Sequence, residues 1–329
     1  MIKKALTLIA VLPLLAACGG GGPTSSDSSS GSGEAFPANC QSINLIVGFS
    51  AGGVTDLAFR AVADQFAKQL DTDVQVINAA GGGGSVAINQ MKAAPHDGCT
   101  IGNANIPTQL QYLYPEVDAG YTKDDFALAG AFGVGPQALA VAADSPYKTL
   151  DDLIKAGKDK GSLTAVVDAP KGSDAIINAQ FAKAAGITVR QVVVDGSSEK
   201  VTALLGGQVD FTDGGLGGLL PSLQSGQLRA LTVWSPERSD SVPDIPTAKE
   251  QGIDVVQETL FGLMMPADVP DAARQKLEDT LKTTTENADF KSQMDKLGIP
   301  VAFMTGTEFS QAWDKMADTI KGINFDSLS

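Results

Sequence analysis

Short apolar runs alternate with amphipathic stretches along the chain from Ile43 onward. The runs are rich in aliphatic residues and carry few charges, a pattern that is typical of strands buried on both faces of a sheet. Nine such runs are predicted to be strands: residues 43–49, 73–79, 100–106, 126–132, 138–143, 162–169, 190–195, 208–213 and 228–234. Because strands that alternate with helices build parallel sheets with crossover helices, the pattern predicts an α/β protein.

The stretches between the runs have the period of amphipathic helices. The first follows residues 43–49, and its apolar face consists of Phe59, Val62, Ala63, Phe66 and Leu70. We expect Thr55 to be its N-cap and Asp56 an acid in its first turn. A second helix is predicted over residues 174–185. The last third of the chain is helical over 271–298, ending at the glycine, and again over 308–322.

The N-terminus has the features of a bacterial secretory signal. Two lysines precede an apolar segment at residues 5–15, which is too short for a membrane span, and the four residues that end at Cys18 are similar to a lipobox. We therefore expect residues 1–17 to be a lipoprotein signal peptide and Cys18 to carry lipid. Residues 18–40 form the lipidated cysteine and a flexible Gly/Ser linker. The alternative is an ordinary cleaved signal with a chance cysteine.

The charge of the chain excludes two classes of partner. There are 24 Lys and Arg residues against 38 Asp and Glu residues, a formal net charge of -14. Nucleic acid and anionic membrane surfaces both need a basic face, so neither is an expected partner. The protein is predicted to touch a membrane only through its lipid anchor.

Two further cysteines, Cys40 and Cys99, form an even pair in an oxidising compartment. Each comes just before a predicted strand, so parallel pairing of these strands would put both cysteines at one sheet edge. A structural disulfide is expected. The alternative, a metal site, lacks ligands, because His96 is the single histidine and the cysteine spacing does not suit zinc. We predict no metal.

Four glycine-containing loops follow predicted strands and precede helical stretches, at residues 48–56, 78–88, 169–174 and 195–199. A loop of this kind leaves backbone N–H groups unpaired at a helix N-terminus, where an anion can bind. Four together suggest a cleft at the carboxyl ends of the strands. The alternative is that each loop is only a turn.

Catalytic groups are scarce in the sequence. His96 lies on a turn, and without it no Ser-His-Asp or Cys-His set can be proposed. Neither a phosphate-binding loop nor a dinucleotide-binding glycine motif is present. We expect no cofactor and no enzyme activity.

Several ordered motifs resemble the substrate-binding proteins of the tripartite tricarboxylate transporters, the Bug family. The resemblance runs from Ile43 to Asp318 and is carried by INLIVGFSAGGVTDLAFR, VINAAGGGGSVAINQMKAAPHDGCTI, LLGGQVD, SGQLRALTV and RSDSVPDIPTAKEQG. It implies a two-lobed periplasmic-binding-protein fold, of the venus flytrap kind and type II-like, with mixed, mainly parallel sheets. It also implies that the protein captures a small mono-, di- or tricarboxylate and delivers it to a two-component membrane permease.

The resemblance assigns ligand-binding residues by position. In the family the first two glycine loops hold one carboxylate, partly through water, and the second domain closes over the other end. The residues implied here are Phe49, Ser50, Gly53, Thr55, Asp56, Gly82, Gly83, Gly84 and Ser85 in the first domain, and Gly172, Ser173, Asp195, Gly196 and Ser197 in the second. Because Asp56 is an anion itself, it is assigned to capping and to holding a water.

The sequence departs from the family at the distal wall of the site. Val194-Asp195-Gly196 replaces the usual aromatic-Lys-Gly, which removes a cation, and Cys99 replaces an aromatic residue after Asp-Gly. Lys171 either replaces the lost cation or is merely solvated.

The resemblance also implies a domain division and a cellular place. Domain 1 would comprise residues 41–132 and 261–329, and domain 2 residues 133–260, with hinge strands near 132–139 and 257–263. We expect a monomer in the periplasm, anchored through Cys18, or at the cell surface in a Gram-positive organism. The alternative functions are a sensor lipoprotein that presents its ligand to a membrane kinase and a periplasmic enzyme.

Overall fold

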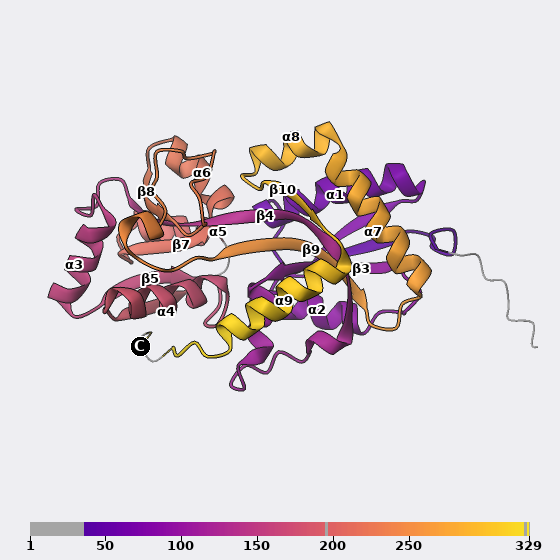
Figure 1. Ribbon diagram of the computed structural model, residues 1–329, viewed down its shortest axis with the longest axis horizontal. Coiled ribbons are helices and arrows are strands. Elements are labelled where there is room, and N and C mark those ends of the chain that lie inside the picture. The colour runs from indigo at the N-terminus through magenta and orange to yellow at the C-terminus, as the bar shows by residue number, and fades with distance from the viewer. Residues whose placement is uncertain (1–35, 195–196, 326–327, 329) are drawn as a thin grey trace, which may run out of the picture. The chain divides into compact units, whose positions relative to one another are not determined.

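The computed structural model of the chain describes residues 36–194, 197–325 and 328 (Figure 1). The predicted signal peptide, Cys18 and the loop residues Asp195 and Gly196 lie outside this part. Within it, no helix is both long and apolar enough to cross a membrane.

The chain alternates between strands and helices, as the sequence pattern predicts. The strands are β1 (Ile43–Val47), β2 (Val74–Asn78), β3 (Thr100–Ile106), β4 (Phe126–Ala142), β5 (Leu163–Val167), β6 (Val189–Val193), β7 (Phe211–Gly215), β8 (Leu228–Val233), β9 (Glu258–Pro266) and β10 (Val301–Met304). The α-helices are α1 (Val54–Leu70), α2 (Ser85–Lys92), α3 (Leu150–Lys160), α4 (Ser173–Ala185), α5 (Ser197–Leu205), α6 (Leu216–Gln224), α7 (Asp271–Glu286), α8 (Ala288–Lys296) and α9 (Gly306–Ile320). Short 3-10 helices lie at η1 (Gly82–Gly84), η2 (Thr108–Leu113), η3 (Lys123–Asp125) and η4 (Lys249–Gln251).

The strands form one mixed sheet in the order β2-β1-β3-β9-β4-β7-β5-β6, and β8 and β10 also pair with β4. The outer groups are parallel, with β1 between β2 and β3 and with β5 between β6 and β7. The long strands β4 and β9 are antiparallel to each other and join the two groups (Figure 1). This is the two-lobed α/β fold that the sequence predicts, with antiparallel crossing strands between parallel outer strands.

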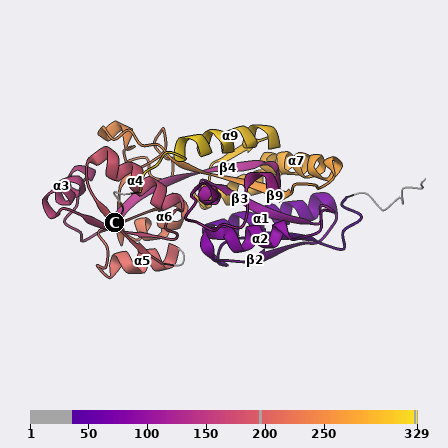
Figure 2. The same cartoon turned by 90° about the horizontal axis from the view of Figure 1, so that it is seen from below.

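Helices cover both faces of each half of the sheet (Figure 2). Around β1, β2 and β3, one face packs against α1, α7 and α8, and the other against α2 and α9. We call this half the first lobe. Around β5, β6, β7 and β8, one face packs against α3 and α4, and the other against α5 and α6. We call this half the second lobe. Each lobe therefore has its own buried apolar core on either side of the sheet.

Two sequence-based boundaries were wrong. The runs 126–132 and 138–143 belong to one strand, β4, because Gly133 and Gly135 between them continue the antiparallel pairing with β9. The helix predicted over 271–298 is two helices, because Asn287 has an extended backbone and its side chain accepts a hydrogen bond from the N–H of Phe290. The short strand β10 carried too weak a pattern to be predicted.

Cys40 and Cys99 form the disulfide that the sequence predicts. Their Cα atoms are 5.5 Å apart. The reason is the parallel pairing of β1 with β3, which sets Asn44 opposite Thr100 and brings the residues before both strands to one edge.

The cap of α9 offers a test of local helix stability. The Thr305 hydroxyl accepts a hydrogen bond from the N–H of Glu308, whose carboxylate accepts one from the N–H of Thr305. We expect Thr305→Ala to lower the free energy of unfolding by about 1 kcal/mol, measured by urea titration. Thr319→Ala, on the exposed face of the same helix, is the control and should change it by less than about 0.5 kcal/mol. Equal effects of the two variants would contradict the capping role.

Candidate functional site

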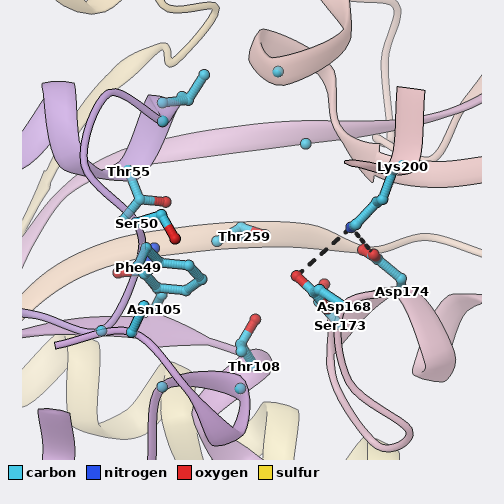
Figure 3. Close-up of a pocket in the computed structure, with 18 of the residues that line it drawn as sticks. Phe49, Ser50, Thr55, Asn105, Thr108, Asp168, Ser173, Asp174, Lys200 and Thr259 are labelled. Carbon is cyan, nitrogen blue, oxygen red and sulfur yellow. Dashed lines mark hydrogen bonds and ion pairs between the residues drawn. The ribbon is translucent and has the colours of Figure 1, made fainter. Parts of the chain in front are cut away.

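A pocket of about 430 Å³ lies at the carboxyl ends of the parallel strands and is lined by both lobes (Figure 3). Its volume is in the range of sites for small molecules. The first lobe contributes Phe49, Ser50, Gly53, Thr55, Gly83, Gly84, Asn105 and Thr108 among others, and the second contributes Asp168, Ser173, Asp174, Glu199 and Lys200. Gln137 of β4 and Thr259 of β9 complete the lining. The glycine loops after β1, β2 and β5 thus converge on one cavity, as expected from their position.

The loop after β1 presents an uncapped helix N-terminus to the pocket. The N-cap of α1 is Gly53 rather than Thr55, and no side chain caps the helix. Gly53 takes an extended backbone, so the N-cap lies two residues before the threonine that the sequence favoured, and the helix begins at Val54. Thr55 is thereby released from capping, and Figure 3 shows its hydroxyl and that of Ser50 directed toward the cavity.

Asp56 lies behind this loop and does not line the pocket. It is 1 % exposed, and its carboxylate accepts hydrogen bonds from the N–H of Gly52, from Arg60 Nε and from Asn78 Nδ2 at 2.8 to 2.9 Å. Burial opposes its ionisation, but these donors outweigh burial and hold the pKa of the Asp56 carboxyl below its ordinary value. Asp56 therefore braces the loop from within but makes no hydrogen bond to the N-cap residue Gly53, and its role in holding a water stays a prediction.

The second glycine loop follows β2 and consists of residues 81–84, all with positive φ. Gly83 and Gly84 line the pocket, whereas Gly82 and Ser85 do not. A Cβ at Gly83 would come within 3.1 Å of the Cβ of Ala169 in the loop after β5, so glycine allows these two loops to approach each other.

The end of β3 supplies two polar groups that the sequence analysis missed. Asn103 Oδ1 accepts from the N–H of Gly48, and Asn103 Nδ2 donates to Asn105 Oδ1 at 2.9 Å. This chain of bonds leaves Asn105 Nδ2 without an acceptor among the described residues. The Thr108 hydroxyl likewise has no partner there, although the two residues are only 2 % and 7 % exposed. The signal in the sequence was the pair of asparagines at alternate positions in an otherwise apolar strand.

Two glutamines hold the hydroxyls of the opposite wall. Ser173, the first residue of α4, accepts from Nε2 of both Gln137 and Gln257, and Thr259 Oγ1 accepts from Gln137 Nε2 at 2.8 Å. Because each hydroxyl oxygen already accepts, its own proton is available to a ligand in the pocket. Gly172, which was predicted to contact the ligand, is the N-cap of α4 and is not in the pocket lining.

The distal wall holds a buried cation that sequence reasoning overlooked. Lys200 on α5 pairs with Asp174 on α4, and its Nζ lies 3.6 Å from Asp168 Oδ2 (Figure 3). Ser197 begins the same helix. The sequence signal was the lysine one turn into the helix after the fourth glycine loop.

Lys171, which sequence analysis considered as the distal cation, does not line the pocket. Its Nζ lies 2.9 Å from Glu116 Oε1 and 3.7 Å from the centroid of the Phe325 ring. It is thus neither the distal cation nor merely solvated, because it ties the loop after β5 to the first lobe.

Burial and neighbouring charges together shift the pKa values of the buried groups at the distal wall. Desolvation raises the pKa of Asp174 to about 7, and nearby Asp168 adds to the shift, while Lys200 opposes it. Burial disfavours the charged form of Lys200 as well, but the two carboxylates outweigh it and raise its pKa, so the ammonium persists. Behind them, burial raises the pKa of Asp213 well above its ordinary value.

The arrangement is suited to binding rather than to acid–base catalysis with histidine. His96 does not line the pocket, is 44 % exposed in its side chain and lies 3.6 Å from Asp268. In the part of the chain that the structure describes, no three His, Cys, Asp or Glu side chains are grouped so as to hold a metal ion. The pocket offers hydroxyl, amide and backbone donors on one side and a lysine with carboxylates on the other.

Comparisons with known proteins agree with this geometry. Residues 58–322 match the family described as "Tripartite tricarboxylate transporter family receptor". A protein of Cupriavidus necator, named "UPF0065 protein in gbd 5'region", is 32% identical over 302 residues, which cover 87% of this chain and 89% of the relative. A solved "periplasmic transporter" is 24% identical with a TM-score of 0.82 and covers 89% of this chain and 100% of that one. MatC from Rhodopseudomonas palustris, solved with bound malate, is 22% identical with a TM-score of 0.79, and the match covers 86% of this chain and 98% of that one.

Proposed function

Because the chain belongs to the tripartite tricarboxylate transporter receptor family, we propose that it is a solute-binding protein that captures a small carboxylate for a two-component membrane permease. The observation that carries the proposal is the first wall of the pocket. There, the open N-terminus of α1 converges on one cavity with donors of Asn105 and Thr108 that have no partner in the described part of the chain. The malate bound to the similar protein MatC supports a carboxylate as the ligand.

Local donors can hold an anion despite the acidic charge of the whole protein. The net charge of -14 acts at long range and is screened over about 8 Å at physiological ionic strength. Hydrogen bonds to a charged group contribute about 1.5 to 3 kcal/mol each, and a helix N-terminus adds about 0.3 to 1 kcal/mol. A few such contacts approach the roughly 8 kcal/mol of a micromolar site.

The proposal extends to the cellular location, the anchor and the domain division of the receptor. We place it in the periplasm as a monomer, tethered through lipid on Cys18, with domain 1 at residues 41–132 and 261–329 and domain 2 at 133–260. The family and the fold are those of substrate-binding proteins rather than enzymes, and His96 lies outside the pocket. A carboxylate ligand that contacts both lobes would favour their closure, because only the closed state brings both walls of the pocket to the ligand at once.

The test is a thermal-shift screen of the purified full-length protein against mono-, di- and tricarboxylates, amino acids and phosphate. Ligand at a hundred times its dissociation constant should stabilise the folded state by about 2.7 kcal/mol. A carboxylate that raises the melting temperature would support the proposal. No shift with any carboxylate, in a folded protein shown to be free of co-purified ligand, would overturn it.

Ser50→Ala tests the first wall directly. The Ser50 hydroxyl lines the pocket, and losing one hydrogen bond to a carboxylate should weaken binding about tenfold, with little change in melting temperature. Isothermal titration calorimetry with the best carboxylate from the screen measures the effect. Ser292→Ala, exposed on α8, is the matched control and should bind like the wild type. Unchanged affinity in Ser50→Ala would remove this residue from the site.

A further inference from the structure

The C-terminal segment that follows α9 contacts both lobes. Ile323 and Phe325 pack against the core of the first lobe. Leu328 packs against the core of the second lobe, where it pairs with Val189 of β6. Figure 1 shows this segment, in yellow, running from α9 toward α4. The segment after α9 therefore links the two lobes in addition to the long strands β4 and β9.

Lys171 of the second lobe reaches the same segment. Its Nζ lies 2.9 Å from Glu116 Oε1 and 3.7 Å from the centroid of the Phe325 ring, and both of these partners belong to the first-lobe side. The Lys171 side chain is only 17 % exposed. A cation over an aromatic ring is attracted more strongly when it is partly buried, because less water competes for its charge. Lys171 thus attracts the second lobe to the first.

The first lobe holds the aromatic side of this contact in place. The Phe325 ring packs edge-on against the Tyr114 ring, with centroids 4.9 Å apart. Tyr114 is buried, and its hydroxyl donates to the carbonyl oxygen of Ile320 at 3.2 Å. Because the ring of Phe325 is already held by these neighbours, little conformational entropy is lost when Lys171 approaches it.

The loop that carries Lys171 also forms part of the pocket wall. Asp168 at its start and Ser173 at its end line the pocket, whereas Lys171 does not. The loop is a tight turn, in which the N–H of Gly172 donates to the carbonyl oxygen of Ala169 at 3.1 Å. A short hydrogen-bonded turn moves as a unit, so holding Lys171 against the first lobe also holds Asp168 and Ser173 at the pocket.

From these contacts we propose that Lys171 and the C-terminal segment form a latch that holds the two lobes together and thereby strengthens ligand binding. Lys171 is a positioning residue in this scheme, because it acts through the loop to which it belongs. The latch consists of protein groups alone, so it favours contact between the lobes both before and after a ligand binds. Its effect on affinity rests on the proposed function, whereas its effect on the arrangement of the lobes does not.

The first experiment is calorimetry on the purified full-length protein, with the tightest binder among succinate, malate and citrate as the probe. Lys171→Met keeps the length and the apolar stem of the side chain but removes its charge. We expect it to raise the dissociation constant about fivefold, because a smaller fraction of the protein has its lobes in contact. Lys171→Arg keeps the charge and should bind within about twofold of the wild type.

Two further variants separate the latch from general effects. Phe325→Leu keeps an apolar side chain against the first-lobe core but removes the ring, so it should weaken binding in the same direction as Lys171→Met. Lys183→Met is the matched control, because this lysine is exposed on α4 and does not line the pocket. It should bind like the wild type.

A second measurement needs no ligand. Small-angle X-ray scattering gives the radius of gyration of each ligand-free, full-length protein. We expect a larger radius for Lys171→Met than for the wild type and for Lys183→Met, because the lobes separate more often when the latch is absent.

The outcomes separate the inference from the proposed function. An unchanged dissociation constant or an unchanged radius of gyration in a folded Lys171→Met protein would overturn the latch and leave the receptor function intact. If none of the three carboxylates binds the wild type, that result counts against the proposed function, and the radius of gyration still decides on the latch. If Lys171→Met does not fold by thermal melting, Glu116→Gln removes the partner charge at a side chain that is 57 % exposed, and unchanged values there would likewise overturn the inference.

Discussion

Replacing Asp213 with asparagine is expected to stabilise the protein at neutral pH, by an amount that grows as pH rises. Asp213 is fully buried on β7, with Oδ1 accepting from Trp234 Nε1 and with Oδ2 unpartnered among the described residues. Burial holds its pKa well above the ordinary value, and Asp174 adds to the shift.

The direction of this change in stability follows from proton linkage. Above pH 4 the unfolded chain releases the Asp213 proton while the folded chain keeps it, so the unfolded state gains about 1.4 kcal/mol per pH unit up to the folded-state pKa. The stability is therefore greatest at low pH and is lost as pH rises. Asparagine has no proton to release and can still accept from Trp234, so the variant avoids this loss of stability as pH rises.

Urea unfolding of wild type and Asp213→Asn at pH 5, 6 and 7 measures the difference. Asp210→Asn is the control, and we expect it to change stability in the opposite direction. Burial disfavours the Asp210 anion, but Thr164, Tyr147 and Lys160 donate to it and lower its pKa, so its contribution is present at neutral pH and lost in acid. Asp210→Asn should destabilise the protein most at pH 7. A difference between wild type and Asp213→Asn that does not grow with pH would show that Asp213 ionises in the folded state.

A valine at Gly217 is expected to weaken ligand binding about a hundredfold, equivalent to about 2.7 kcal/mol. Gly217 lies in the first turn of α6 in the second lobe, where a Cβ would come within 1.9 Å of the carbonyl oxygen of Leu297 and 3.3 Å of Val54 Cγ1 in the first lobe. The lobes must separate here to admit the side chain. Since Val54 and Gly218 line the pocket, the separation would draw its two walls apart.

Calorimetry with the best carboxylate ligand measures this loss, and thermal melting shows whether each lobe stays folded. Gly322→Val is the matched control, because no atom lies within 4 Å of a Cβ built there and the position is remote from the pocket lining. Wild-type affinity in a folded Gly217→Val protein would show that the contact with Leu297 is not needed for binding.

The sequence predicted the glycine loops of the site more fully than the charged side chains that line it. Glycine after a strand and before a helix is a local signal, and the loops at residues 48–56, 78–88 and 169–174 all border the pocket. The pairing of Lys200 with Asp174 depends on how α5 packs against α4, two helices separated in sequence, so no local pattern reveals it. Lys171 was a candidate for the distal cation because it lies in the glycine loop in sequence. Its side chain instead pairs with Glu116 in the other lobe, which a local pattern does not show.

By itself, the sequence determined the α/β class, the alternation of strands and helices, the disulfide and the loops at the strand ends. These follow from periodicity, turn chemistry and residue type, which act over a few residues. The tertiary structure decided that β4 continues through its glycines, that Gly53 rather than Thr55 caps α1, and that the distal wall is acidic. Such features depend on sheet register and on the burial of charges contributed by distant segments, where electrostatic free energies change most with the surroundings.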